Sequence, residues 1–401
     1  MKSFISLEEA IHILNDNVNA LGFEEVSLLQ SIGRILGEDM YSDIDNPPFD
    51  KSAMDGYAVI SSDTENHEKT LEVIDEVFAG NICESEVVFG TAVRIMTGAP
   101  MPRGADAVVK QEDIELKDGC IITKKPLSLG ENICFKGEDV KKGSLLVQKN
   151  KRLDYADIGI LASAGISKVK VYKKPKVAFI STGDEVLDID KDLTGGKIYN
   201  SNKYTILGRL IELGYEITYV DHENDSFQGI GEKIKKATEV ADFIITTGGA
   251  SVGEKDLIKE AIDYINGEKL FWKITIKPGS AMLCSKYAGK IIISLSGNPT
   301  AALTTFELIA KTTLEKLSGK EEIEIIREKA TLTNSFLKRS PQRRYLRGTV
   351  TANEKGQKVT ITQVKSGNGI LSSTLNSNCL IELEKGNDGV KEGDMVTIIK
   401  F

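Results

Sequence analysis

The fold of this chain depends on one stretch, Ile244-Ile245-Thr246-Thr247-Gly248-Gly249-Ala250-Ser251-Val252-Gly253-Glu254-Lys255-Asp256. The apolar run at its start predicts a buried strand, and the apolar spacing after it predicts a helix. A strand, a glycine-rich turn and a helix can together present backbone N–H groups to an anion. The alternative is a tight turn whose glycines only supply positive φ angles. Because glycine-rich turns are a weak signal, this stretch alone leaves both interpretations open.

The composition is that of a soluble globular protein with a net negative charge. The 401 residues allow about two to four domains. Hydrophobic residues make up 41% of the chain and charged residues 27%, which are ordinary values for such proteins. The formal net charge of −8 at pH 7 disfavours nucleic acid and anionic membranes as partners. Local groups must therefore hold any anionic ligand.

Several kinds of site and location are poorly supported by the residues present. The five cysteines form no CxxC pair, which is typical of reduced thiols in the cytoplasm. The three histidines are far apart in sequence, which disfavours zinc clusters and histidine-based triads. No Walker A motif occurs, which disfavours a nucleotide-dependent kinase. No segment has the apolar length of a signal peptide or membrane span, so we expect a cytoplasmic protein.

The sequence pattern predicts four domains. We expect a discontinuous N-terminal domain at residues 1–45 and 140–175, with a β-rich domain inserted at residues 46–139. Over residues 176–320 strands alternate with helices, which predicts an α/β domain with a parallel sheet and helices on both faces. The helical periodicity then fades, and short strands predict a small β domain at residues 321–401.

Two loops of the inserted domain, residues 94–106 and 130–139, are dense in glycine, proline or acidic residues. Long ordered loops often carry function, but a structural Ω-loop is an alternative for the first of them. For the second, a solvated turn is a more common use of paired acids than a metal site.

Polar residues follow each predicted strand of the α/β domain, at the edge where ligands bind in open parallel sheets. Hydroxyl groups, glycine N–H groups, lysines and acids therefore converge there, which favours a phosphate-bearing ligand and a divalent cation. Any single acid is more often a helix cap or a solvated loop residue, so the hypothesis rests on the convergence. The residues are Ser181, Thr182, Gly183, Glu185, Asp225, Thr247, Gly248, Gly249, Ser251, Gly253, Asp256, Lys273, Lys277, Asn298 and Pro299.

Six motifs in the same order resemble those of the molybdopterin molybdenumtransferases, the family of bacterial MoeA proteins and the E domain of gephyrin. Spread over essentially the whole chain, they are together far more specific than any one of them. The motifs are SAMDGYAV (52–59), IMTGA (95–99), GED (137–139), STGDE (181–185), TGGASVGEKD (247–256) and IKPG (276–279).

The resemblance implies a homodimer with a dimerising N-terminal domain, a molybdopterin-binding α/β domain and a C-terminal β-barrel-like domain. It implies insertion of molybdate-derived metal into adenylylated molybdopterin, with release of AMP and with Mg²⁺ as the cation. The inserted domain of the partner subunit is expected to complete the site. The molybdopterin adenylyltransferase is a candidate partner protein.

The resemblance also implies roles for individual residues. Asp55 and Thr97 are expected to reach in from the partner subunit, and Lys273 and Lys277 to neutralise pyrophosphate or molybdate. Asp139, Glu185, Asp225 and Asp256 are expected to organise metal and phosphate, and Arg343 with Ser372 or Ser373 to contact the oxyanion. The residues expected to be catalytic are Asp55, Thr97, Asp139, Glu185, Asp225, Lys273 and Lys277.

The sequence departs from the family pattern at three positions. Cys134 stands where the family usually has a basic residue, Ser280 where it has a second lysine, and Ser296 where it has a proline. A paralogue that inserts tungsten, or a pterin-binding scaffold protein without insertase activity, is therefore the alternative hypothesis.

Overall fold

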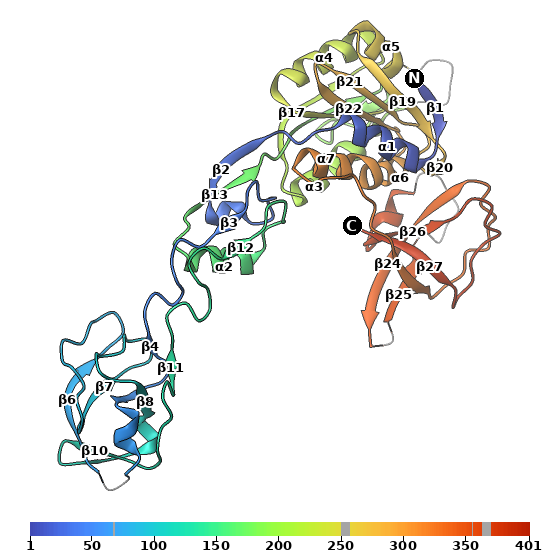
Figure 1. Ribbon diagram of the computed structural model, residues 1–401. Helices are drawn as coiled ribbons and strands as arrows, with labels where there is room; N and C mark the ends of the chain where they lie inside the picture. The colour runs from blue at the N-terminus through green and yellow to red at the C-terminus, as the bar shows by residue number, and fades with distance from the viewer. Residues whose placement is uncertain (67–68, 250–256, 355, 363–369) are drawn as a thin grey trace. The chain divides into compact units, whose positions relative to one another are not determined.

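The computed structural model describes residues 1–66, 69–249, 257–354, 356–362 and 370–401 (Figure 1). The chain divides into two compact units. One unit comprises Met1–Glu24 with Tyr172–Phe401, and the other is Glu25–Val171. In the described helices, no stretch is both long and apolar enough to cross a membrane.

A seven-stranded sheet lies at the centre of the first unit, in the order β1-β19-β21-β22-β18-β14-β17 (Figure 1). The neighbours β22, β18, β14 and β17 are parallel, as the alternation of strands and helices predicts. The strands are β1 (Lys2–Ile5), β14 (Lys176–Thr182), β17 (Glu216–Glu223), β18 (Phe243–Thr247), β19 (Glu268–Ile274), β21 (Leu283–Tyr287) and β22 (Lys290–Leu295). A short parallel pair, β15 (Val186–Leu187) and β16 (Ile198–Tyr199), follows β14.

One strand of this sheet departs from the predicted parallel arrangement. β21 is antiparallel to both β19 and β22 and is not among the predicted strands. Ala288 and Gly289 join β21 to β22 with φ angles of 48° and 77°. Positive φ at both central residues defines the tight hairpin turn that suits the twist of two strands. A two-residue connection leaves no room for the helix that a parallel crossover needs.

Helices cover both faces of the sheet (Figure 1). Successive residues of β18 show the division, because Phe243 and Ile245 pack on one face and Ile244 on the other. Each such buried side chain contributes about 1.5–3 kcal/mol to folding. The first face carries α1 (Leu7–Asn17), α3 (Ser201–Glu212), α6 (Pro299–Thr305), the π-helical turn η4 (Phe306–Ala310) and α7 (Lys311–Leu317), and the second carries α4 (Phe227–Val240) and α5 (Leu257–Tyr264).

The first 24 residues lie in the α/β unit rather than with residues 25–45. β1 adds a parallel edge strand beside β19, and α1 buries Leu7, Ala10 and Leu14 against the sheet. The Ser6 side chain caps α1 by accepting a hydrogen bond from the Glu9 backbone, as the sequence predicts. The four-domain division stays a prediction. Its first domain was expected to include residues 1–24, whereas these residues lie with the α/β unit because their apolar side chains complete its core.

A closed five-stranded barrel forms the C-terminal part of the same unit, which confirms the predicted β-barrel-like domain. The strands follow the order β24-β25-β23-β27-β26, and pairing of β24 with β26 closes the barrel. A short strand from the α/β part, β20 (Ile276–Lys277), pairs with β24. The barrel comprises β23 (Glu328–Leu332), β24 (Arg343–Asn353), β25 (Gly356–Ile361), β26 (Cys379–Leu383) and β27 (Met395–Lys400), with the short helix η5 (Leu371–Thr374).

The second unit contains a six-stranded sheet in the order β8-β5-β7-β6-β10-β9, which confirms the predicted β-rich character of this region. It comprises β5 (Gly56–Val59), β6 (Leu71–Val77), β7 (Thr91–Ile95), β8 (Ala107–Lys110), β9 (Ile114–Lys117) and β10 (Cys120–Thr123), with short helices η2 (Ser61–Thr64) and η3 (Gln111–Asp113). The segments around it are β2 (Phe23–Ser27), η1 (Leu28–Ser31), β3 (Met40–Tyr41), β4 (Lys51–Ser52), β11 (Ile133–Cys134), β12 (Leu145–Val147), α2 (Tyr155–Ser163) and β13 (Lys168–Tyr172).

Candidate functional site

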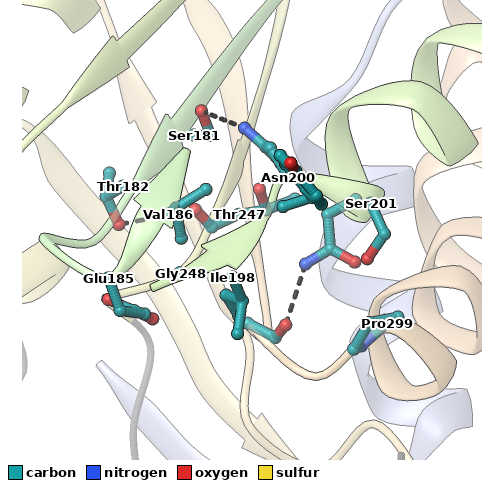
Figure 2. A pocket seen from close by; sticks show the side chains of 13 residues that line it. Ser181, Thr182, Glu185, Val186, Ile198, Asn200, Ser201, Thr247, Gly248 and Pro299 are labelled. Atoms are coloured by element: carbon teal, nitrogen blue, oxygen red, sulfur yellow. Dashed lines mark hydrogen bonds between the residues drawn. The ribbon is translucent and has the colours of Figure 1, made fainter. Parts of the chain in front are cut away.

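A pocket opens at the carboxyl ends of β14 and β18, where the sequence predicts a ligand (Figure 2). Its volume is about 60 Å³. One water molecule needs roughly 10–15 Å³ by this measure, so the pocket has room for a phosphate-sized group. The lining residues are Ser181, Thr182, Glu185, Val186, Ile198, Tyr199, Asn200, Ser201, Asn202, Thr247, Gly248, Gly297 and Pro299.

Strand ends and a helix start supply the polar groups of this pocket. Ser181 and Thr182 end β14, Thr247 ends β18, and Ser201 begins α3. The positive end of a helix favours an anion, and hydroxyl groups can donate hydrogen bonds to it. The pocket therefore offers mostly neutral donors to a negatively charged group.

Gly248 is required by a close approach of two backbones. Its φ angle is 91°, which supports the turn interpretation of the glycine-rich stretch. In addition, a Cβ atom at this position would lie 2.3 Å from the carbonyl oxygen of Thr182. A side chain here would therefore push the loop after β18 away from the end of β14. The glycine thus does more than permit the turn, because it also shapes the pocket, whereas anion binding by the stretch stays a prediction.

The predicted acidic ligands are only partly within the described residues. Glu185 lines the pocket, whereas Asp225 is exposed and donates its backbone N–H to Asp184 Oδ1 at 3.1 Å. Asp256, with Ser251 and Gly253, lies outside the described residues. Across the described parts of the chain, no three His, Cys, Asp or Glu side chains form a group that could hold a metal ion.

The two predicted lysines do not line this pocket. Lys273 is buried, and its ammonium lies 3.8 Å from the ring centroid of Trp272 and 5.1 Å from that of Phe4. Its φ angle of 60° is unusual for a residue with a side chain. Such backbone strain costs on the order of 1–3 kcal/mol and is found preferentially at functional sites. Lys277 lies on β20, beside Arg344 of the barrel.

Asp55 and Thr97 come together in the second unit. Asp55 Oδ1 accepts hydrogen bonds from the Thr97 backbone at 2.8 Å and from its hydroxyl at 2.7 Å. The backbone hydrogen bond and then the hydroxyl hydrogen bond lower the pKa of Asp55, so this carboxylate is ionised at neutral pH. Asp139 accepts a hydrogen bond from the Asn46 side chain at 3.1 Å. Their approach to a partner subunit stays a prediction.

Two of the predicted oxyanion residues of the barrel, Arg343 and Ser373, already have partners. Arg343 forms an ion pair with Glu8 and lies 3.6 Å from carboxylate oxygens of both Glu382 and Glu384. Ser373 is buried and donates its hydroxyl to the Ile370 carbonyl at 2.6 Å. Ser372 is exposed. Arg343 and Ser373 therefore have little capacity left for a ligand in this arrangement.

A different arginine of the same strand, Arg347, has side-chain atoms without a hydrogen-bond partner in the described parts of the chain. It is 4% exposed, and among the described residues its Nε and Nη2 atoms have no hydrogen-bond partner. Burial lowers its pKa to about 10. Nε and Nη2 form one edge of the guanidinium group, the edge that binds carboxylates and tetrahedral oxyanions with two parallel hydrogen bonds.

Arg347 faces a second cavity, of about 440 Å³, between the α/β part and the barrel. Glu307 of η4 lies in this cavity and pairs with Arg209 of α3 at 2.7 Å. Arg347 is not among the predicted residues, because β24 carries three arginines and the sequence does not show which of them keeps side-chain atoms without a partner. The other lining residues are Thr205, Gly208, Glu212, Leu303, Thr374, Ser377, Asn378 and Phe401.

These features define an α/β protein with an attached β-barrel, a small polar pocket at the strand ends and a cavity beside Arg347. Residues 5–165 match the model of the MoeA N-terminal region (domain I and II). Residues 178–316 match a probable molybdopterin binding domain, and residues 329–401 match the MoeA C-terminal region (domain IV). The chain belongs to the MoeA family of molybdopterin molybdenumtransferases.

Full-length relatives support this assignment. The molybdopterin molybdenumtransferase of Staphylococcus aureus (strain COL) is 38% identical over 405 residues, which cover 98% of this chain and 95% of the relative. That of Staphylococcus epidermidis is 36% identical over 403 residues, with the same coverage of 98% and 95%. The crystal structure of the molybdopterin biosynthesis MoeA protein from Pyrococcus horikosii has a TM-score of 0.83 and 33% identity, and the match covers 99% of this chain and 98% of that one.

Gly248→Ala tests the close approach at the pocket. The added Cβ would meet the Thr182 carbonyl, so we expect pyrophosphate to bind at least about tenfold more weakly, a loss of roughly 1.4 kcal/mol. Titration calorimetry measures the affinity. Gly143→Ala is the matched control, since its φ of 85° is similar but no atom lies within 4 Å of the added Cβ. Equal affinities of the two variants would contradict this role of Gly248.

Proposed function

We propose that this chain inserts molybdate-derived metal into adenylylated molybdopterin and releases AMP, in molybdenum cofactor biosynthesis. The observation that carries the proposal is the phosphate-sized pocket at the strand ends of the region that matches a probable molybdopterin binding domain. The full-length relatives named molybdopterin molybdenumtransferase support the same activity. The chemistry is one of positioning anions, since it needs no nucleophile from the protein.

The pocket beside Gly248 holds a phosphate group of the pterin substrate in this proposal. Hydroxyl groups of Ser181, Thr182 and Thr247 and the start of α3 surround the space. They can donate to phosphate oxygens without placing another full charge next to Glu185. These hydrogen bonds thereby fix the phosphate-bearing end of the pterin. The protein then determines how far the pterin lies from the bound oxyanion.

Mg²⁺ is the proposed cation of this pocket. Glu185 lines the pocket and supplies carboxylate oxygens, and Asp225 and Asp256 are the other two proposed ligands. Oxygen ligands of this kind fit a hard divalent cation. Bound there, Mg²⁺ would neutralise charge on the phosphate groups and on Glu185.

Arg347 is the proposed oxyanion contact. Molybdate is a tetrahedral dianion, and the free Nε–Nη2 edge of a buried guanidinium matches two of its oxygens. An unpaired buried charge costs several kcal/mol, so an anion that enters the cavity is strongly favoured. Tungstate has the same shape and charge, so this contact does not distinguish the two metals. The alternative of a tungsten-inserting paralogue is therefore tested by the same AMP-release assay, with tungstate in place of molybdate.

We further propose a cytoplasmic homodimer in which the inserted domain of one subunit completes the site of the other. The bonded pair of Asp55 and Thr97 provides an ionised, oriented carboxylate for that purpose. The adenylyltransferase that makes the substrate is the proposed protein partner. Lys273 and Lys277 are proposed to neutralise negative charge on the pyrophosphate or the oxyanion.

AMP release tests the proposed activity directly. The purified protein is incubated with adenylylated molybdopterin, Mg²⁺ and either molybdate or tungstate, and AMP is measured by chromatography. We expect AMP to appear with at least one oxyanion and not without oxyanion. If the protein binds the substrate but releases no AMP with either molybdate or tungstate, the scaffold alternative is favoured. The departures from the family pattern at Cys134 and Ser280 would then explain the missing activity.

Arg347→Met and Arg343→Met together identify the oxyanion contact. Replacing buried Arg347 removes an unpaired charge, so we expect stability to be unchanged or about 1–4 kcal/mol higher and molybdate binding to be lost. Replacing Arg343 breaks its ion pairs, so we expect lower stability with molybdate binding retained. Urea unfolding and equilibrium dialysis measure the two properties. The reverse pattern would assign the oxyanion to Arg343.

Mixing Asp55→Ala with Gly248→Ala tests the shared site. At substrate concentrations well below the weakened affinity, each variant alone is expected to release little AMP, because each damages every site of its own dimer. In a mixed dimer, one site combines the intact α/β domain of one subunit with the intact inserted domain of the other. Half of the dimers are mixed after free exchange, and half of their sites are intact, so about a quarter of the wild-type AMP release is expected. No recovery would contradict a shared site.

A further inference from the structure

The hydroxyl of Ser181 lies between two side chains, Asn200 and His222, at the end of β14. Ser181 and Asn200 are buried and line the pocket (Figure 2). His222 lies beside Ser181 in register on the neighbouring strand β17. We infer that His222 is a positioning residue: by donating from Nδ1 to Ser181, it directs the Ser181 hydroxyl hydrogen to the phosphate in the pocket. This inference rests on the proposed phosphate site.

The orientation of Asn200 is fixed by the helix that it caps. Its Oδ1 atom accepts the backbone N–H of Lys203 at 3.0 Å, in the first turn of α3. The amide nitrogen must therefore be the atom that faces Ser181 Oγ, at 2.8 Å. An amide nitrogen can only donate, so the Ser181 oxygen accepts this hydrogen bond.

His222 Nδ1 lies 3.0 Å from Ser181 Oγ, and two arrangements are possible for this contact. If Nδ1 carries no proton, Ser181 donates its only hydrogen to the histidine and has none for a ligand. If Nδ1 carries the proton, Ser181 accepts from both His222 and Asn200. A serine hydroxyl has two acceptor positions and one hydrogen, so in the second case the hydrogen is free for the pocket.

A phosphate oxygen selects between these arrangements, because it only accepts hydrogen bonds. It can form a bond with Ser181 when His222 donates, and it meets only lone pairs of Ser181 when His222 accepts. A bound phosphate therefore favours the state with a proton on Nδ1. The neighbouring acids Asp221 and Glu223 lie 2.7 and 3.7 Å from the ammonium of Lys233, which offsets their charge. The sequence alone does not show which tautomer of His222 is present. The tautomer depends on the hydrogen bond that the Asn200 amide donates to Ser181.

The proton position is measured by NMR on protein with ¹⁵N-labelled histidine, saturated with inorganic pyrophosphate at a pH of about 8, where an ordinary imidazole is neutral. His222→Asn assigns the signals. We expect the Nδ1 signal of His222 to be that of a protonated nitrogen in the complex. A complex in which Nδ1 lacks the proton overturns the inference and leaves the phosphate site intact.

Two substitutions give an independent test. His222→Leu removes the donor, and we expect pyrophosphate to bind about tenfold more weakly. His222→Asn keeps an amide near the Nδ1 position, and we expect it to recover most of this loss. The control is His12→Leu, because His12 is exposed on α1. A merely structural role would lower the unfolding temperature of both His222 variants without separating their affinities.

The outcomes separate this inference from the proposed function. Unchanged affinity in His222→Leu overturns the role of His222 while wild-type binding still supports the phosphate site. No pyrophosphate binding by the wild-type protein removes the phosphate site, and the inference about His222 fails with it. AMP release then decides separately whether the chain still carries out the proposed reaction.

Discussion

A contact between two backbones at the carboxyl edge of the sheet determines the shape of the candidate site. The loop after β18 approaches the end of β14 so closely that a Cβ at Gly248 would lie 2.3 Å from the Thr182 carbonyl. This approach is possible because β14 and β18 are adjacent and parallel, so both end at the same edge. The hydroxyl groups of two strands and the start of α3 therefore surround one small space. A longer side chain at this position would separate them.

The sequence predicts much of this arrangement because the signals are local. The apolar run of β18 and the glycines after it identify a buried strand and a turn, and the alternation with helices predicts the layers. β21 was not predicted because it forms a hairpin with β22 through Ala288 and Gly289, which interrupts the alternation of strands and helices. β1 was not predicted because it is a short edge strand that lies far in sequence from its partner β19. The closed barrel was predictable only in class, since its closure depends on pairing of β24 with β26.

Some residues of the candidate site follow from local sequence signals, and others depend on tertiary packing. Ser181, Thr182 and Thr247 follow predicted strands, so a rule about strand ends finds them. Arg347 does not follow from such a rule, because it shares β24 with Arg343. Glu8, which is 335 positions away in sequence, pairs with Arg343, Ser340 accepts from Arg344, and Arg347 keeps Nε and Nη2 without a partner among the described residues. The identity of the free cation is thus a result of tertiary packing.

The two anion sites differ in physical character, and the difference suits the two proposed ligands. The pocket at the strand ends uses neutral donors, which can hold a phosphate that stays partly hydrated or bound to a cation. The cavity of the barrel instead offers a buried charge. Two carboxylates line it, Glu212 and Glu307, which lie 3.0 and 2.7 Å from Arg209, and Glu307 also lies 3.6 Å from Lys311. Three cations, Arg209, Lys311 and Arg347, therefore stand against two carboxylates, and this excess positive charge, in a protein of net charge −8, suits the proposed oxyanion.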